Sequence, residues 1–150
     1  METRGQSPRC TVLVAEDRLT IRSLISDLLR ANGYGVLEAA NGRLAIELLA
    51  QHEVDLVITD ACMPELGGRG LYEHIEKHQP HLLDKLIVIT GHLREDTEFF
   101  QMSTRVPILY KPFGLDELLD AVRKAPSSPQ LTPRSKKACL QTTPPPNIGL

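Results

Sequence analysis

Polar residues that could do chemistry stand where apolar, strand-like runs of this chain end. Glu16 and Asp17 follow TVLVA, Asp60 follows LVIT, and Thr90 and Lys111 close later apolar runs. Because parallel strands bring their carboxyl ends to one edge of a sheet, we expect these side chains to share one crevice. Carboxylates that converge in this way repel each other unless a cation joins them, and oxygen ligands with open positions suit Mg²⁺.

A crevice of this composition is equipped to receive a phosphoryl group. Asp60 is the candidate nucleophile, because a carboxylate that attacks phosphorus forms an acyl phosphate. A bound metal ion and Lys111 would neutralise charge on the transferring oxygens. Thr90 would supply a hydroxyl to a phosphate oxygen. The simpler alternative is an acidic surface edge that happens to hold one lysine.

Elements that could position these residues alternate along the chain as apolar strands and amphipathic helices. Five short strands separated by helices predict an α/β protein with a doubly wound parallel sheet covered on both faces. Asn32-Gly33 is expected to end the first helix, and Asn41-Gly42 to open the second. The predicted strands are residues 11–15, 34–39, 55–59, 85–90 and 106–110. The predicted helices are the stretch from Leu19 to the stop at Asn32-Gly33, the stretch after 42, and residues 71–78, 95–102 and 115–124.

Composition divides the chain into a short flexible N-terminus (1–8), one folded domain (9–125) and a C-terminal tail (126–150). The tail contains six of the eleven prolines and no aromatic residue, which predicts disorder. The tail has three basic residues and no acidic one, which gives it a charge of +3. Because the whole chain has a net charge of −2, residues 1–125 carry −5. This acidic balance argues against nucleic-acid binding by the folded part.

Targeting and redox signals are weak. The first ten residues lack the apolar core of a signal peptide, and no apolar run is long enough to cross a bilayer. Three cysteines without a CxxC pair make a disulfide framework or a zinc site improbable. We therefore expect a cytoplasmic protein that does not bind membranes.

Four motifs follow each other along the chain: ED (16–17), DACMPELGG (60–68), TG (90–91) and KPF (111–113). Together they resemble the receiver domain of two-component response regulators, the CheY-like family. Each motif alone is common, but their spacing on this strand pattern is specific. The resemblance covers residues 9–125 and is greatest to receivers joined to hybrid sensor kinases. It implies a flavodoxin-like sheet with strand order 2-1-3-4-5.

The resemblance also implies a role for each site residue. Asp60 would be the phosphoacceptor, Thr90 the switching hydroxyl and Lys111 the phosphate-binding cation, with a cis bond between Lys111 and Pro112. The position of the family's switch aromatic holds Ile108, while Tyr110 directly precedes the lysine. The implied magnesium ligands are Asp17, Asp60, Glu16 through water and the backbone carbonyl of Cys62.

By the same resemblance, a histidine kinase or histidine phosphotransfer protein would donate the phosphoryl group. We expect a stand-alone switch, not an enzyme with a substrate of its own, with an output partner at the surface of residues 95–102, 106–110 and 115–124. Leu19 and Arg22 are candidates for kinase docking. A pseudo-receiver that only binds partners is one alternative. A magnesium-dependent phosphohydrolase is another, although such enzymes usually have a second aspartate where Cys62 stands.

Several other patterns have simpler explanations. His74 and His78 are spaced for a metal, with His81 nearby, but a solvated helix face accounts for them better. Gly67–Gly70 suggests a flexible turn more than a phosphate cradle. Cys62 and His92, each two residues past a site residue, are in this family positions that tune phosphate lifetime.

Overall fold

Five parallel strands form the centre of the computed structural model, which describes residues 10–91 and 95–125 apart from the side chains of residues 95, 96, 102 and 103. The sheet order is β2-β1-β3-β4-β5, which confirms the predicted doubly wound topology. The flexible N-terminus and disordered tail predicted from composition lie outside the described residues, as does His92. The strands are β1 (Thr11–Ala15), β2 (Gly35–Ala39), β3 (Leu56–Asp60), β4 (Leu86–Thr90) and β5 (Ile108–Tyr110).

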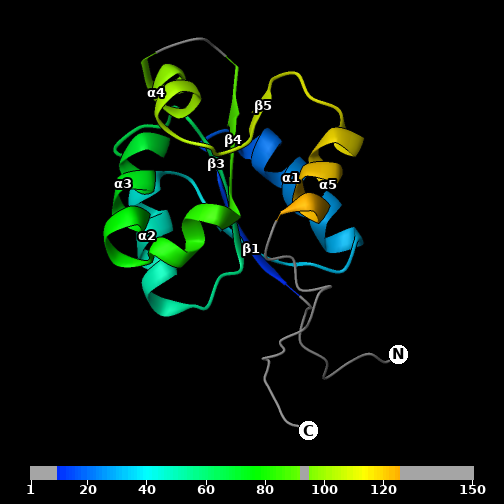
Figure 1. Cartoon of the computed structure of the whole chain (residues 1–150). Coiled ribbons are helices and arrows are strands. Elements are labelled where there is room, and N and C mark those ends of the chain that lie inside the picture. The colour runs from blue at the N-terminus through cyan, green and yellow to red at the C-terminus, as the bar shows by residue number, and fades with distance from the viewer. Residues whose placement is uncertain (1–9, 92–94, 126–150) are drawn as a thin grey trace, which may run out of the picture.

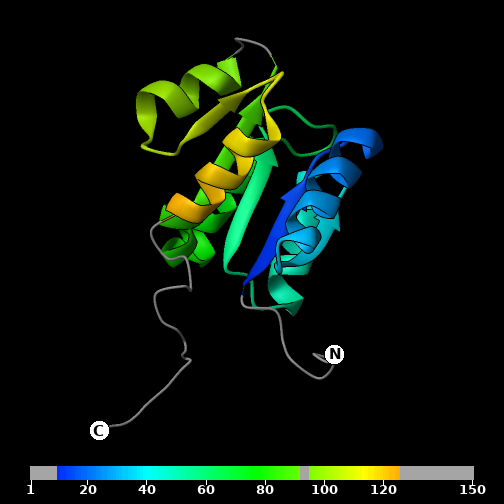
Figure 2. The ribbon, with the colours of Figure 1, turned by 90° about the vertical axis from the view of Figure 1, so that its right-hand side faces the viewer.

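Helices cover both faces of this sheet. Helices α1 and α5 lie together on one face, while α2, α3 and α4 lie on the other (Figures 1 and 2). Among the residues that the structure describes, no helix is long and apolar enough to cross a membrane. The helical segments are α1 (Leu19–Ala31), α2 (Gly42–Gln51), α3 (Gly68–His78), the short 3₁₀ helix η1 (Pro80–Lys85), α4 (Glu95–Ser103) and α5 (Leu115–Lys124).

Strand alternation divides the core into two layers. In β1, Val12 and Val14 pack with Ile25 of α1 and Leu118 of α5. The intervening Leu13 points to the other face, into the cluster formed with α2 and α3. Successive side chains of a strand point to opposite faces, so a parallel strand covered on both sides must be apolar at every position. This requirement ends where the covered part of the sheet ends, so the last residue of a strand can be polar.

Helix boundaries follow local signals where those signals are strong. Asn32 forms the C-cap of α1, and the following Gly33 has φ +91°, a conformation that glycine adopts readily. Asn41 caps α2 by accepting a hydrogen bond from the backbone N–H of Leu44. Both predicted boundaries are confirmed. The 3₁₀ turn at Pro80–Lys85 has no counterpart in the sequence-based prediction.

Strand ends differ from the prediction where backbone hydrogen bonding decides them. Strand β5 begins at Ile108, two residues later than expected, because Pro107 has no N–H to donate to the ladder and only accepts from Val88. Strand β3 runs through Asp60, one residue further than predicted. Asp60 is thus still fixed by the sheet register, opposite Ile89 of β4.

The predicted turn at Gly67–Gly70 is wrong, because α3 already begins at Gly68. A Cβ added at Gly68 would lie 2.7 Å from the carbonyl oxygen of Asp60 and 3.0 Å from the Cα of Ala61. The absent side chain therefore lets α3 approach the end of β3. The glycine is required for packing beside the site and not for a flexible turn.

This close approach predicts a large effect for a single methyl group. We expect Gly68→Ala to destabilise the protein by about 1–3 kcal/mol, since the clash is with backbone atoms that cannot rotate away. Chemical denaturation would measure it, with Gly114→Ala as the control because its nearest neighbour would be a flexible Glu117 oxygen at 3.9 Å. Equal stability of the two variants would contradict the packing argument.

Candidate functional site

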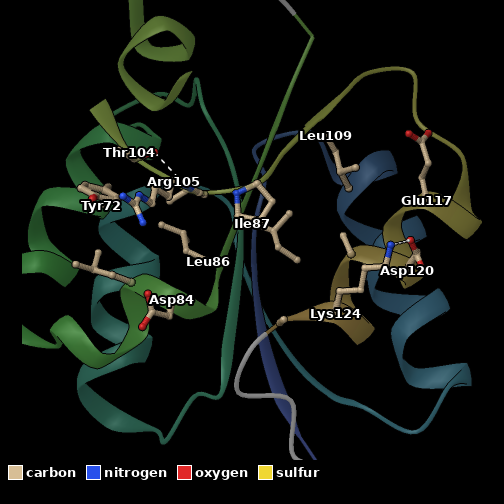
Figure 3. A pocket seen from close by; sticks show the side chains of 15 residues that line it. Tyr72, Asp84, Leu86, Ile87, Thr104, Arg105, Leu109, Glu117, Asp120 and Lys124 are labelled. Carbon is tan, nitrogen blue, oxygen red and sulfur yellow. Dashed lines mark hydrogen bonds and ion pairs between the residues drawn. The ribbon is translucent and has the colours of Figure 1, made fainter. Parts of the chain in front are cut away.

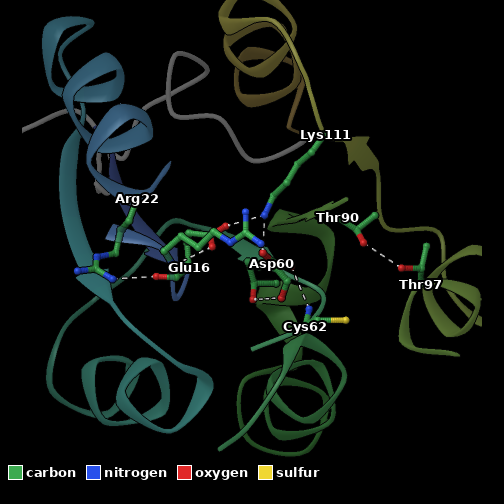
Figure 4. A network of polar contacts seen from close by, with 9 residues as sticks. Glu16, Arg22, Asp60, Cys62, Thr90, Thr97 and Lys111 are labelled. Atoms are coloured by element: carbon green, nitrogen blue, oxygen red, sulfur yellow. Dashed lines mark hydrogen bonds and ion pairs between the residues drawn. The ribbon is translucent and has the colours of Figure 1, made fainter. Parts of the chain in front are cut away.

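The predicted site residues meet in an open crevice of about 610 Å³ at the carboxyl ends of the strands. Asp60, Cys62, Thr90 and Lys111 all line it, together with Asp17 from the loop after β1. Figure 4 shows Glu16, Asp60 and Lys111 converging between α1 and the loop after β5. The sheet topology therefore brings together side chains that are far apart in the sequence.

A second, larger hollow of about 810 Å³ lies elsewhere, beneath the start of β5 and between η1 and α5. Figure 3 shows it with Leu86 and Ile87 of β4 at its floor and Arg105, Asp120 and Lys124 at its sides. Within the described ranges, no cluster of three metal-ligating side chains lies there. The larger volume of this hollow is therefore no evidence that it is the functional site.

Three carboxylates in the crevice can share one cation. One oxygen from each of Glu16, Asp17 and Asp60 lies within 4.8 Å of the others, and this is the only such cluster among the residues that the structure describes. Glu16 and Asp60 are buried, while Asp17 is exposed. Hard oxygen ligands that leave positions open suit Mg²⁺, so the donor set fits the predicted metal. Among the described residues, His74 and His78 belong to no such cluster.

Lys111 bridges the two buried acids. Its Nζ donates to Asp60 Oδ2 at 2.7 Å and to Glu16 Oε1 at 3.2 Å. Burial alone would lower the pKa of Lys111, but the hydrogen bond and charge of Asp60, supported by Glu16, raise it overall. The backbone N–H of Lys111 donates to the carbonyl of Thr90, and the Lys111–Pro112 bond is cis as expected. The side chain thus remains cationic and points at the acids.

Glu16 is a fully buried carboxyl beside another carboxyl. Burial, together with the Asp60 charge, raises the pKa of Glu16 to about 7, although the hydrogen bond from the Arg18 N–H and the charge of Lys111 act in the opposite direction. Arg22 donates to the backbone carbonyl of Glu16 at 2.9 Å and so fixes the end of β1. A divalent cation in the crevice would favour the charged form of Glu16.

This raised pKa predicts how stability depends on pH without metal. The folded state holds a proton on Glu16 that the unfolded chain releases above pH 4.5, so this stabilisation is lost as the pH rises through about 7. In EDTA we expect the free energy of unfolding to fall by about 1 kcal/mol more in wild type than in Glu16→Gln between pH 6 and 8. Urea titrations at both pH values measure this difference. Parallel pH profiles of the two proteins would contradict it.

Asp60 is oriented by the turn that follows it. The backbone N–H of Cys62 donates to Asp60 Oδ1 at 3.0 Å, while Lys111 binds the other oxygen. The carboxylate therefore presents a defined face to the crevice. Cys62 itself is partly buried at the crevice wall.

The hydroxyl of Thr90 has a partner that the sequence did not suggest. Thr90 Oγ1 and Thr97 Oγ1 of α4 lie 3.0 Å apart, and both residues are buried. Thr97 stands in a helix whose sequence has little amphipathic pattern, and no motif marks it. Only the packing of α4 over the end of β4 reveals the contact.

Most of the chain is similar to a known protein family. Residues 12–123 match the model of the response regulator receiver domain. The chain belongs to the response regulator receiver family. A receiver resembling it is found in the crystal structure of the response regulator TrrA from Thermotoga maritima in complex with Mg²⁺ and BeF, with a TM-score of 0.68 and 28% identity over 77% of this chain and 98% of that one.

Relatives of this receiver include proteins of different architecture. It is 33% identical to the transcriptional regulatory protein PdtaR of Mycobacterium tuberculosis, covering 77% of this chain but only 56% of PdtaR. It is 32% identical to the sensor kinase CckA of Brucella abortus over 79% of this chain and 13% of that protein. Receivers of hybrid sensor kinases are thus among its homologues, as predicted. The family typically works as a non-enzymatic phosphoacceptor switch.

The switch positions of this receiver differ from what the family resemblance implies. Ile108, which occupies the aromatic position, is partly buried beside Val88. Tyr110 is 47% exposed, and its hydroxyl accepts a hydrogen bond from the Gln101 amide of α4. The aromatic side chain of β5 therefore contacts the outer part of α4 and does not replace Thr97 at the Thr90 hydroxyl.

The two proposed docking residues on α1 differ in character. Leu19 is 63% exposed, as a contact residue should be. The Arg22 guanidinium instead donates to Glu38 of β2 at 3.1 Å as well as to the Glu16 carbonyl. Arg22 is therefore part of the framework of the receiver, which sequence reasoning missed because its partners lie on other elements.

Proposed function

We propose that this receiver accepts a phosphoryl group on Asp60 from a histidine kinase or a histidine phosphotransfer protein in a magnesium-dependent step. The observation that carries this proposal is the cluster of Glu16, Asp17 and Asp60 within 4.8 Å, with the Lys111 ammonium 2.7 Å from the Asp60 carboxylate. The acid cluster suits a divalent cation, and that cation together with the Lys111 ammonium would neutralise the negative charge that moves into the crevice.

Each residue has a distinct part in this step. An oxygen of Asp60 attacks the phosphorus, the P–N bond of the donor phosphohistidine breaks, and its electron pair returns to the imidazole, leaving an acyl phosphate on Asp60. Lys111 exchanges its contact with the carboxylate for a phosphoryl oxygen, and Thr90 donates its hydroxyl to another. Bound Mg²⁺ would supply charge neutralisation for the transferring oxygens. Its proposed ligands are Asp17, Asp60, the Cys62 carbonyl and, through water, Glu16.

Phosphorylation would place about two negative charges among Thr90 and Lys111 and so shift a two-state surface. We propose that this surface comprises α4, β5 and α5, and that a downstream protein partner reads it. The contact between Tyr110 and Gln101 joins β5 to α4 there and supports a coupled movement. We further propose that the receiver works in the cytoplasm, without binding nucleic acid or membranes, as the composition favours.

A small phosphodonor tests the phosphoacceptor proposal without a cognate kinase. Incubation with acetyl phosphate and Mg²⁺ is expected to add the mass of one phosphoryl group to the intact protein, and EDTA is expected to prevent it. The adduct should be lost in hydroxylamine, which cleaves acyl phosphates. A wild-type protein that takes up neither phosphate nor beryllofluoride in Mg²⁺, the latter monitored by NMR, would support the pseudo-receiver alternative. Continuous release of inorganic phosphate from a small ester would support the phosphohydrolase.

A further inference from the structure

The loop that links β3 to α3, residues 61–67, serves the site through its second residue. The backbone N–H of Cys62 donates to Asp60 Oδ1 at 3.0 Å, and the Cys62 carbonyl is a proposed Mg²⁺ ligand. A hydrogen bond from the Gly68 N–H to the Ala61 carbonyl, at 3.0 Å, closes the loop on itself. A displacement of this loop would therefore move the acceptor carboxylate and a metal ligand together.

The conformation of this loop is not one that its own residues favour. Glu65 has a φ of 66°, in the left-handed region that side chains such as glutamate seldom adopt. On the far side of this residue, the Leu66 N–H donates to the Pro64 carbonyl at 2.7 Å, so the turn is tight. A backbone in such a conformation persists only where its surroundings hold it. Contacts from outside the loop are therefore needed to fix its shape.

The first residues of α2 supply these contacts. The first N–H groups of a helix have no acceptor within the helix, and the N–H of Gly42 donates to the Leu66 carbonyl at 2.9 Å. Gly42 is buried, and a Cβ added there would lie 2.5 Å from that carbonyl oxygen. Beside it, Arg43 Nε donates to Glu65 Oε1 at 3.0 Å. The start of α2 thus contacts the loop through a backbone hydrogen bond, close packing and an ion pair.

We propose that Gly42 is a positioning residue for the phosphoacceptor and magnesium site, with Arg43 in support. Its N–H and its lack of a side chain let α2 fix the loop, and the loop in turn holds the Cys62 peptide at Asp60. Neither Gly42 nor Arg43 is among the described residues that line the crevice, so their effect reaches the site through the loop. The sequence explains Gly42 only as part of a helix start. This inference rests on the proposed function of Asp60.

Calorimetric titration of the full chain with Mg²⁺ tests this role. In Gly42→Ala the added methyl group meets a backbone oxygen that cannot rotate away, so the loop must shift. We expect Mg²⁺ affinity to fall about tenfold, as it does when groups that orient metal ligands are changed. Leu49→Ala is the control, because Leu49 is buried in the core near the other end of α2. It should lower the thermal stability and leave Mg²⁺ affinity unchanged.

Removal of the ion pair tests the same loop without adding an atom to the packed contact. The double variant Arg43→Gln/Glu65→Gln keeps the net charge, so the overall attraction of the protein for Mg²⁺ is preserved. We expect its Mg²⁺ affinity to fall about two- to fivefold, the range of an exposed ion pair. The matched control is Asp120→Asn/Lys124→Gln, which removes an exposed 2.9 Å ion pair of α5 and should bind Mg²⁺ as wild type does.

The outcomes separate the positioning role from the proposed function. Wild-type Mg²⁺ affinity in Gly42→Ala would overturn the positioning role, as would an equal loss in Leu49→Ala. If Gly42→Ala does not fold, wild-type affinity in the double variant Arg43→Gln/Glu65→Gln overturns it. A wild-type protein that binds no Mg²⁺ and takes up no phosphoryl group from acetyl phosphate would instead overturn the proposed function, and the positioning role with it.

Discussion

Asp60→Asn will reduce labelling by acetyl phosphate by more than about a hundredfold while leaving the protein folded. The substitution removes the nucleophilic oxygen but keeps the shape of the side chain. The amide oxygen can still accept from the Cys62 N–H, and Lys111 keeps its contact with Glu16. Loss of labelling without loss of structure would therefore identify the carboxylate as the acceptor. Intact mass and a thermal melt measure the two effects.

Asp55→Asn provides a matched control for this experiment. Asp55 is also a partly buried aspartate of the β3 segment, but it lies at the opposite end of the strand, where its Oδ2 accepts from the Thr11 N–H at 2.9 Å. We expect its labelling to equal that of wild type. An adduct that persists at the wild-type level in Asp60→Asn would place the phosphate on another residue and refute the proposed site.

Lys111→Met will slow labelling by about a hundredfold, the effect expected when one preorganised charge is removed from a reacting centre. The methionine side chain is close to lysine in length but has no cation to meet the transferring oxygens. The same substitution leaves Glu16, Asp17 and Asp60 without their fixed cation, so Mg²⁺ affinity should increase. The variant is thus expected to bind metal more tightly and to react more slowly.

A higher Mg²⁺ affinity together with a lower labelling rate distinguishes a role of Lys111 in the site from a general loss of structure. Mg²⁺ titration by calorimetry and the initial rate of labelling at saturating Mg²⁺ measure the two quantities. Lys77→Met, on the exposed side of α3, is the control and should change neither. A Lys111→Met protein with weakened metal binding, or with an unchanged labelling rate, would contradict the role assigned to the ammonium group.

Local patterns in the sequence were sufficient for the fold class, whereas the strand order was implied by the family resemblance. Helix α5 has the bounds predicted from its periodicity, 115–124, and the Asn41-Gly42 signal located the start of α2. Predictions were wrong where a tertiary contact decides the boundary. Gly68 appeared to belong to a turn, and nothing in its neighbourhood indicated that the end of β3 would pack against it. Strand β5 is shorter than predicted because Pro107 lacks the backbone N–H that would donate a hydrogen bond to the sheet.

The sequence alone determined which residues stand at the strand ends, because an apolar run that stops at an acid or a lysine is visible without coordinates. It thereby located Glu16, Asp60 and Lys111. Only the tertiary structure decided how they meet: Lys111 reaches across 95 positions to Glu16, which no local pattern encodes. The same is true of the Thr90–Thr97 bond and of Arg22, whose partners are set by how helices pack on the sheet. Periodicity specifies the face on which a side chain lies, whereas its neighbour on that face is fixed only when the elements pack.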